Sequence, residues 1–272
     1  GYLFGQYKRI TNRYESGVLT GKGIGWGGSL VRTEATGYGL VYFLQQMLGT
    51  KKASLDGRRV VVSGSGNVAV HAIEKAQELG ATVLACSDSA GYVVDHKGID
   101  LGLIREIKVT KRGRIAEYAA RRGADAEYVP GGSIWNVPCD VALPCATQNE
   151  LTEADAAALI QGGVLAVAEG ANMPCTPDAI RAFQAAGVLY APGKAANAGG
   201  VATSALEKQQ NAGRDSWAFD YTDKRLGEIM VAVHERCAAA TDEYGQPGNY
   251  ALGANISGFV QVADAMMAQG LI

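Results

Sequence analysis

The stretch RRVVVSGSGNVAVHAIEKAQELGATVLACSD, residues 58–88, decides the fold of this chain of 272 residues. Its run of valines, Val60–Val62, predicts a strand that is buried on both faces. A glycine-rich turn follows, and residues 68–80 then carry apolar side chains at helical spacing. A second apolar run ends at Asp88, 24 positions after Gly64. The stretch therefore predicts a strand, a turn, a helix and a second strand.

The turn has the sequence GSGNVA, residues 64–69, which fits the pattern GxGxxA of dinucleotide-binding βαβ units. Gly64 allows a tight turn, Gly66 lets the backbone approach a pyrophosphate, and Ala69 lets helix and strand pack closely. The start of the helix supplies backbone amides and the positive end of a dipole. An acid at the position of Asp88 is placed to meet an adenosine ribose. Together these features predict a dinucleotide site; the alternative is a glycine turn with a structural role only.

Short apolar runs alternate with helical patterns along most of the chain, including a long helical pattern at residues 36–48. The strand candidates are RRVVVSG (58–64), ATVLACSD (81–88), AEYVP (126–130), CDVALPCA (139–146), GVLAVAEGA (163–171) and GVLYAPG (187–193). Such alternation is typical of βαβ units. We therefore predict an α/β fold with a doubly wound, Rossmann-like, mainly parallel sheet and helices on both faces.

The composition excludes several classes of function. With 25 basic and 27 acidic residues, the chain has no charge excess that would favour nucleic acid or an anionic membrane as a partner. Five cysteines without CxxC spacing and three scattered histidines argue against a metal site or a disulfide framework, so we expect buried thiols and a cytoplasmic protein. No apolar run is long enough for a membrane span. Because the chain begins without methionine, we interpret it as a fragment.

Five segments that follow predicted strands are rich in small residues and in amides or hydroxyls. They are SGSGN (63–67), SDSAG (87–91), PCATQNE (144–150), EGANMP (169–174) and PGKAANAGG (192–200). In a doubly wound sheet, ligands bind beyond the carboxyl ends of the strands. Amide side chains suit ribose hydroxyls and a nicotinamide carboxamide. Each segment alone could be an ordinary turn, but together they predict one extended polar ligand across the sheet edge.

Several long motifs resemble the small hexameric glutamate dehydrogenases of bacteria. They are TGKGIGWGGSLVRTEATGYG (20–39), GSGNVA, PCATQNEL, EGANMP, APGKAANAGGVATSALE (191–207) and GANISGFVQVADAMMAQG (253–270). The resemblance covers essentially the whole chain and points to the C-terminal, cofactor-binding part of such an enzyme. It implies reversible oxidative deamination of L-glutamate to 2-oxoglutarate and ammonia with a nicotinamide cofactor, in a full-length homo-hexamer.

The resemblance also implies a division of the chain into parts. Residues 1–27 would be the tail of a missing N-terminal substrate domain and a hinge. Residues 28–248 would form the dinucleotide-binding domain, and residues 249–272 a C-terminal helix that returns to the substrate domain. The reactive lysines and the aspartate of the family precede the cofactor domain, so we expect no catalytic residue in this chain. Alone, it would bind cofactor without catalysis.

The resemblance assigns roles to individual residues. The pyrophosphate would be held by Gly64, Ser65, Gly66, Asn67 and Val68. Thr36 and Asn197 would fix the nicotinamide, whose ribose side would be lined by Ala146, Thr147, Gln148, Ala171 and Asn172. Val201 and Ser204 would close over the substrate side chain, with Ser204 donating to its distal carboxylate. Arg32 is a further substrate-side candidate, and its alternative is a surface ion-pair partner.

Two lysines in these motifs receive no chemical role. Lys194 is not part of a phosphate-binding Walker loop, because Ala195 follows it where that loop has serine or threonine. We expect a structural or supporting role for it. Lys22 falls in the turn between the domains.

The choice between NADP and NAD rests on conflicting signals. A carboxylate at Asp88 would accept from a free 2′-hydroxyl, which favours NAD. Ser87, Ser89 and the basic run REIKVTKRGR (105–114) resemble the NADP-using branch, with Lys108 pairing with a 2′-phosphate and Lys111 and Arg112 behind it. The resemblance favours NADP, with NAD as the alternative; the run could instead be a solvated helix face.

Other functions remain as alternatives. A leucine, valine or phenylalanine dehydrogenase would share this cofactor domain, but a hydroxyl at Ser204 suits a distal carboxylate better than a branched side chain. A nucleotide-binding module without catalysis is a second alternative. A methyltransferase of Rossmann type would leave the nicotinamide-side segments unexplained.

Overall fold

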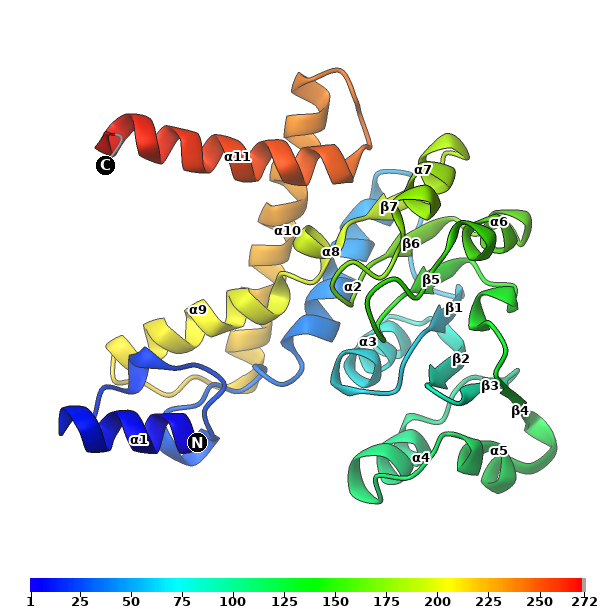
Figure 1. Ribbon diagram of the computed structural model, residues 1–272, viewed down its shortest axis with the longest axis horizontal. Helices are drawn as coiled ribbons and strands as arrows, with labels where there is room; N and C mark the ends of the chain where they lie inside the picture. Colours follow the sequence, from blue (N-terminus) through cyan, green and yellow to red (C-terminus); the bar gives the residue numbers. More distant parts are fainter. Residues whose placement is uncertain (271–272) are drawn as a thin grey trace.

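A computed structural model describes residues 1–270 and contains one seven-stranded sheet with helices packed on both faces (Figure 1). The strand order is β4-β3-β2-β1-β5-β6-β7. The strands are β1 (Arg59–Val62), β2 (Thr82–Asp88), β3 (Gly91–Asp95), β4 (Ala126–Pro130), β5 (Val141–Leu143), β6 (Ala166–Ala168) and β7 (Leu189–Ala191). Because β2 lies on one side of β1 and β5 on the other, the sheet has a topological switch point between β1 and β5.

The sheet is mainly parallel, as predicted. β1 pairs in parallel with both β2 and β5, and β6 and β7 continue the parallel order. β3 is antiparallel to both β2 and β4 and was not predicted. It follows β2 through a two-residue turn, Ser89-Ala90, with Asp88 paired to Gly91, so a hairpin replaces the βαβ unit expected at this place.

Eleven helices of α type are present in residues 1–270. They are α1 (Tyr2–Thr11), α2 (Ala35–Gly49), α3 (Asn67–Glu78), α4 (Leu101–Arg105), α5 (Ala116–Arg122), α6 (Glu153–Gln161), α7 (Pro177–Ala185), α8 (Gly193–Ala196), α9 (Gly199–Ala212), α10 (Phe219–Glu243) and α11 (Tyr250–Gln269). Two hydrophobic clusters cover the two faces of the sheet. Val60 and Val62 join the cluster beneath α2, α3 and α10, whereas Val61 joins the cluster beneath α6 and α7. This alternation is the side-chain period of a strand buried on both faces.

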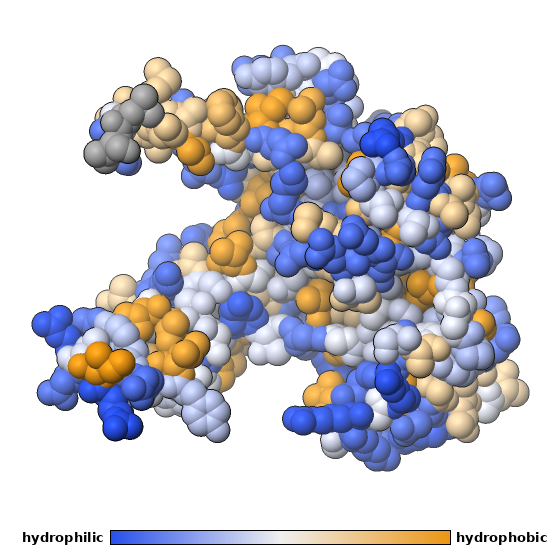
Figure 2. All heavy atoms as spheres, in the orientation of Figure 1, coloured by the Kyte–Doolittle hydropathy of each residue, from blue (hydrophilic) through white to orange (hydrophobic). Residues whose placement is uncertain are grey.

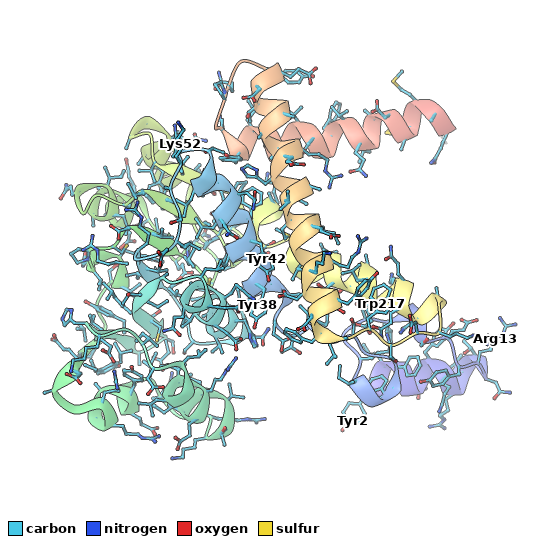
Figure 3. All side chains as sticks on the ribbon, turned by 180° about the vertical axis from the view of Figure 1, so that it is seen from behind. Tyr2, Arg13, Tyr38, Tyr42, Lys52 and Trp217 are labelled. Carbon is cyan, nitrogen blue, oxygen red and sulfur yellow. The ribbon has the colours of Figure 1, made fainter. Side chains whose placement is uncertain are left out.

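Helix α2, where a helical pattern was predicted, packs directly on the backbones of α3 and α9. A Cβ at Gly37 would lie 2.6 Å from the backbone nitrogen of Ala72, and one at Gly39 would lie 2.8 Å from the Cα of Gly199. Tyr42 lies on the same helix (Figure 3), and its hydroxyl donates to Asp223 of α10 at 2.7 Å. The glycines therefore set how closely α2 approaches its neighbours.

Helix α11 and the pair α1–α9 extend away from the sheet on the same side of the molecule (Figure 1). Figure 2 shows a wide hollow between them. Large apolar side chains are exposed on α11, among them Phe259, Val262 and Met267, and on α1, among them Tyr2 and Leu3. Within residues 1–270, no helix combines the length and apolar character that crossing a membrane requires.

We predict that Gly37→Ala lowers the free energy of unfolding by about 1–3 kcal/mol, because the added methyl group would overlap the backbone of α3. Gly49→Ala in the same helix is the matched control, since no atom lies within 4 Å of a Cβ there. It should leave stability unchanged or raise it by up to about 1 kcal/mol. Urea unfolding measures both, and equal effects would contradict the role of Gly37.

Candidate functional site

The glycine turn after β1 has the geometry that its sequence predicts. Gly64 has φ +83°, a conformation that residues with a Cβ rarely adopt. A Cβ there would also lie 3.1 Å from the Cα of Ala146 in the segment after β5. The Gly64 amide donates to the Ser87 hydroxyl at 2.8 Å. Helix α3 begins immediately after Gly66, so its first-turn amides, which have no partners within a helix, lie at this turn.

A cavity of about 710 Å³ lies beyond the carboxyl ends of β5 and β6. It brings together eleven residues that the sequence analysis assigned to the cofactor or to the substrate: Arg32, Thr36, Val68, Ala146, Thr147, Gln148, Ala171, Asn172, Asn197, Val201 and Ser204. It adds Cys145, Gly170 and Gly200, which lie in the predicted ligand segments but were not assigned individually. The remaining predicted residues, Gly64–Asn67, lie beside it in the glycine turn, and Ser87–Ser89 lie at the end of β2.

Asn197 holds one wall of this cavity. Its side-chain amide donates to Asn172 Oδ1 at 2.8 Å and to the carbonyls of Gly170 and Ala171, both at 3.3 Å. Opposite, a Cβ at Gly200 would lie 2.5 Å from Thr36 Oγ1, so the missing side chain makes room for that hydroxyl. The consecutive glycines Gly199 and Gly200 are the feature of the sequence that could have indicated this close approach to Thr36.

Cys145 forms part of the cavity wall as a buried thiol whose pKa is raised by burial. All five cysteines are buried and unbridged, as predicted. No group of three or more potential metal-binding side chains occurs in the described part of the chain. The polar side chains that line the cavity are the hydroxyls of Thr36, Thr147 and Ser204, the amides of Gln148, Asn172 and Asn197, and the guanidinium of Arg32.

At the end of β2, the carboxylate of Asp88 is largely buried. It accepts from the amides of Ala90 at 2.9 Å and Ile115 at 3.1 Å, and Lys108 Nζ lies 3.5 Å away. Burial raises the pKa of Asp88, but these hydrogen bonds and the Lys108 charge outweigh it, so its pKa is lowered. The carboxylate that the sequence offered to a ribose hydroxyl is thus engaged by its own chain.

Positive charge gathers beside this carboxylate. Arg114 Nη1 donates to the Ser89 hydroxyl at 2.9 Å and lies 3.8 Å from Asp88. Lys108 lies in a π-helical turn, Glu106–Thr110, and also donates to the carbonyl of Gly113 at 3.0 Å. Lys111, expected behind Lys108, instead pairs with Glu106 at 2.8 Å. Arg114 was not distinguished from the rest of the basic run.

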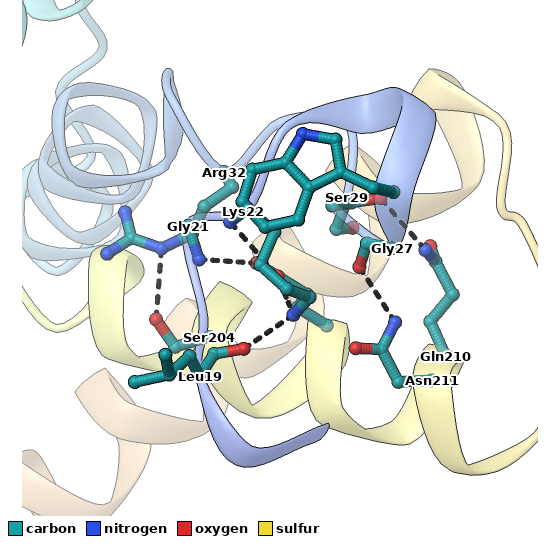
Figure 4. A network of polar contacts seen from close by, with 12 residues as sticks. Leu19, Gly21, Lys22, Gly27, Ser29, Arg32, Ser204, Gln210 and Asn211 are labelled. Atoms are coloured by element: carbon teal, nitrogen blue, oxygen red, sulfur yellow. Dashed lines mark hydrogen bonds and ion pairs between the residues drawn. The ribbon is translucent and has the colours of Figure 1, made fainter. Parts of the chain in front are cut away.

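At the opposite end of the cavity, Arg32 and Ser204 form a pair (Figure 4). Arg32 Nε donates to Ser204 Oγ at 2.9 Å, and this hydroxyl donates to the Gly200 carbonyl at 3.1 Å. The hydroxyl predicted to donate to a substrate is therefore hydrogen-bonded within α9. The guanidinium of Arg32 is the positive group at this end.

The segment that carries Arg32 is fastened to α9 by a buried ion pair (Figure 4). Lys22 Nζ lies 2.5 Å from Glu207 Oε1, and the two side chains are 2% and 0% exposed. The Gly21 amide donates to the same carboxylate at 2.8 Å. Gln210 and Asn211 donate to the carbonyls of Gly28 and Gly27 at 3.1 and 2.8 Å. The sequence gave Lys22 no such role.

Comparison with known proteins assigns the chain to a family. The model for glutamate/leucine/phenylalanine/valine dehydrogenases matches residues 27–270. The chain belongs to this family. Its similarity extends over the whole chain to the NAD(P)-specific glutamate dehydrogenase of Xylanibacter ruminicola (54% identical) and the NADP-specific enzyme of Escherichia coli (54% identical). In both cases the chain spans 61% of the relative.

Solved glutamate dehydrogenases share the fold. The structure of the Plasmodium falciparum enzyme superposes with a TM-score of 0.97 at 44% identity, covering 100% of this chain and 59% of that one. A hetero-hexameric glutamate dehydrogenase from Thermus thermophilus superposes with a TM-score of 0.86 at 23% identity, covering 100% of this chain and 62% of that one. At this identity the likeness shows the fold alone. The resemblance to the cofactor-binding portion of glutamate dehydrogenases is confirmed.

Within this dehydrogenase portion, Lys194 has the structural place that we predicted. It lies outside the cavity lining, and its Nζ contacts Asn255 Oδ1 at 2.5 Å, which joins α8 to α11.

We predict that Glu207→Ala lowers the free energy of unfolding by about 3–5 kcal/mol, because it leaves the buried Lys22 charge without its partner. Glu228→Ala removes an exposed carboxylate that pairs with Arg225, and should cost about 0–1 kcal/mol. Urea unfolding of both variants tests this difference. Similar losses would show that the buried pair contributes no more than a surface one.

Proposed function

We propose that this chain is the cofactor-binding portion of an NADP-dependent glutamate dehydrogenase. The complete enzyme would convert L-glutamate reversibly to 2-oxoglutarate and ammonia. The observation that carries this proposal is the cavity beyond β5 and β6, which brings Thr36 and Asn197 together with the Arg32–Ser204 pair. Its supporting evidence is membership of the dehydrogenase family and similarity to enzymes named as glutamate dehydrogenases.

The residues present fit a dinucleotide. The first-turn amides of α3 and the Cβ-free turn at Gly64 and Gly66 suit the pyrophosphate. The amide side chains of Asn172 and Asn197 and the hydroxyl of Thr36 suit the nicotinamide half. When bound, the nicotinamide accepts or supplies the hydride. The role of this chain is to orient it and to exclude water from its reactive face.

The end of β2 supports NADP over NAD. A 2′-phosphate is best bound by charge-assisted hydrogen bonds, and Lys108, Arg114 and Ser89 converge there. For NAD, the Asp88 carboxylate would have to accept from a ribose hydroxyl while it already accepts from Ile115 and Ala90. We therefore assign Asp88 to holding the cationic site together.

We predict that the chain binds NADPH more tightly than NADH, as measured by fluorescence titration. Lys108→Glu and Arg114→Ala should each weaken NADPH binding about 10- to 100-fold, because a hydrogen bond to a charged group contributes about 1.5–3 kcal/mol. The affinity for NADH, which lacks the 2′-phosphate, should stay unchanged. Lys111→Glu is the matched control, because Lys111 pairs with Glu106. An equal effect of Lys108→Glu and Lys111→Glu would remove Lys108 from the phosphate site.

Glutamate is the substrate that the Arg32–Ser204 pair favours. A guanidinium and a hydroxyl at the cavity end suit a distal carboxylate, whereas leucine, valine or phenylalanine would bring an apolar side chain there. Val201, which is 71% exposed, would cover that side chain. If the chain only bound nucleotides, the Arg32–Ser204 pair would have no ligand group to bind. The proton-transferring groups would come from the substrate domain, and this chain alone would not catalyse.

In the complete enzyme, Ser204→Ala and Arg32→Ala should lower kcat/KM for glutamate about 10- to 100-fold, because each removes a polar partner of the distal carboxylate. The matched control is norvaline, which has a methyl group in place of that carboxylate. Its kcat/KM and the affinity for NADPH should change less than threefold. Equal losses for glutamate and norvaline would contradict this assignment.

The exposed apolar faces of α1 and α11 support the proposed division of the chain. We propose that residues 1–27 are the tail of a substrate domain and a hinge, and that residues 249–272, of which 271 and 272 lie outside the described residues, return to that domain. The hollow between α1 and α11 would receive it (Figure 2). Hinges would lie near residues 25–28 and 248–253. A hexamer would form through the full-length enzyme.

A further inference from the structure

A ring of hydrogen bonds closes the switch point between β1 and β5. Ser63 Oγ, after β1, accepts from the Cys145 amide at 2.8 Å and donates to Glu150 Oε1 at 2.8 Å. The same carboxylate oxygen accepts from the amides of Ala146 at 3.0 Å and Thr147 at 3.3 Å. The side chains of Ser63 and Glu150 together thus join the end of β1 to three consecutive residues after β5.

Glu150 does not line the cavity, but the segment that it holds does. Ala146 and Thr147 are exposed, so the apolar core does not fix their conformation. The turn is completed by Asn149, which has φ +55° and whose amide donates to the Met173 carbonyl at 2.9 Å. Carboxylate bonds to the first two amides therefore fix the part of the turn that faces the cavity.

The position of this turn matters because it meets the glycine turn backbone to backbone. A Cβ at Gly64 would lie 3.1 Å from the Cα of Ala146 and 3.2 Å from its Cβ. A small movement of Ala146 would therefore either close or widen the crevice where a dinucleotide would cross from one strand to the next. The adenosine end, held by Asp88, Lys108 and Arg114, shares no residue with the ring.

We propose that Glu150 is a positioning residue for the nicotinamide half of the cofactor. It acts through Ala146 and Thr147. By accepting hydrogen bonds from their amides, Glu150 holds this turn in the conformation that would receive the nicotinamide ribose. A carboxylate suits this task because one oxygen accepts all three hydrogen bonds. Burial raises the pKa of Glu150 against the opposing effect of these bonds. The inference rests on the proposed function, since it presupposes that a dinucleotide binds here.

The test uses the 272-residue chain and two probes. NADPH, followed by its fluorescence, occupies the whole site, whereas 2′,5′-ADP, followed by calorimetry, occupies only the adenosine half. We expect Glu150→Ala to weaken NADPH binding about 10-fold and 2′,5′-ADP binding less than twofold. Glu150→Gln keeps one acceptor oxygen and should fall in between. Glu153→Gln, at the exposed start of α6, is the matched control and should change neither affinity.

Ser63→Ala breaks the same ring from the other side and gives a second route if Glu150→Ala does not fold. It should reproduce the selective loss of NADPH affinity. Unchanged NADPH affinity in both variants, or equal weakening of both probes, would overturn the positioning role. Failure of the unaltered chain to bind either probe would overturn the proposed cofactor site itself, and the inference with it.

Discussion

The backbone contact between Gly64 and Ala146 is the constraint on which the candidate site depends. β1 and β5 are parallel neighbours whose chains then leave in opposite directions, so their ends form the crevice of a doubly wound sheet. The contact is possible because Gly64 has no Cβ and adopts a positive φ. The start of α3, the ring around Glu150 and the cavity beyond β5 are all placed relative to this contact.

Helix α9 connects that crevice to the segment before α2. Successive turns of the helix carry Gly200 against Thr36, Ser204 against Arg32 and Glu207 against Lys22. Because a helix is stiff over this length, the buried Lys22–Glu207 pair and the Arg32–Ser204 pair cannot shift independently. The polar groups at one end of the cavity therefore depend on an ion pair that lies outside the cavity lining.

The sequence predicted what depends on local pattern and on strand direction. The β1–α3–β2 unit follows from the residues of 58–88 alone. That the segments after β5 and β6 share one cavity follows because the carboxyl ends of parallel strands meet at one sheet edge, whereas Arg32 and Thr36 were assigned only through the family resemblance. β3 was missed because its hairpin breaks the βαβ alternation. Glu150 and Glu207 were missed for another reason: each has a side-chain partner far along the chain, Ser63 at 87 positions and Lys22 at 185, and no spacing rule reports such a contact.

Asp88 shows why residue type at a predicted position does not decide ligand preference. An acid at the end of the second strand accepts from a ribose when its oxygens face the ligand. Here those oxygens accept hydrogen bonds from the amides of Ile115 and Ala90 and lie beside Lys108, so the carboxylate is already bound by groups of its own chain. The charge that would repel a 2′-phosphate is thereby offset by Lys108, and Arg114 lies beside both Ser89 and Asp88. In the proposed NADP site, the preference would be decided by whether the protein itself occupies the carboxylate, which depends on the backbone amide of Ile115, 27 positions along the chain.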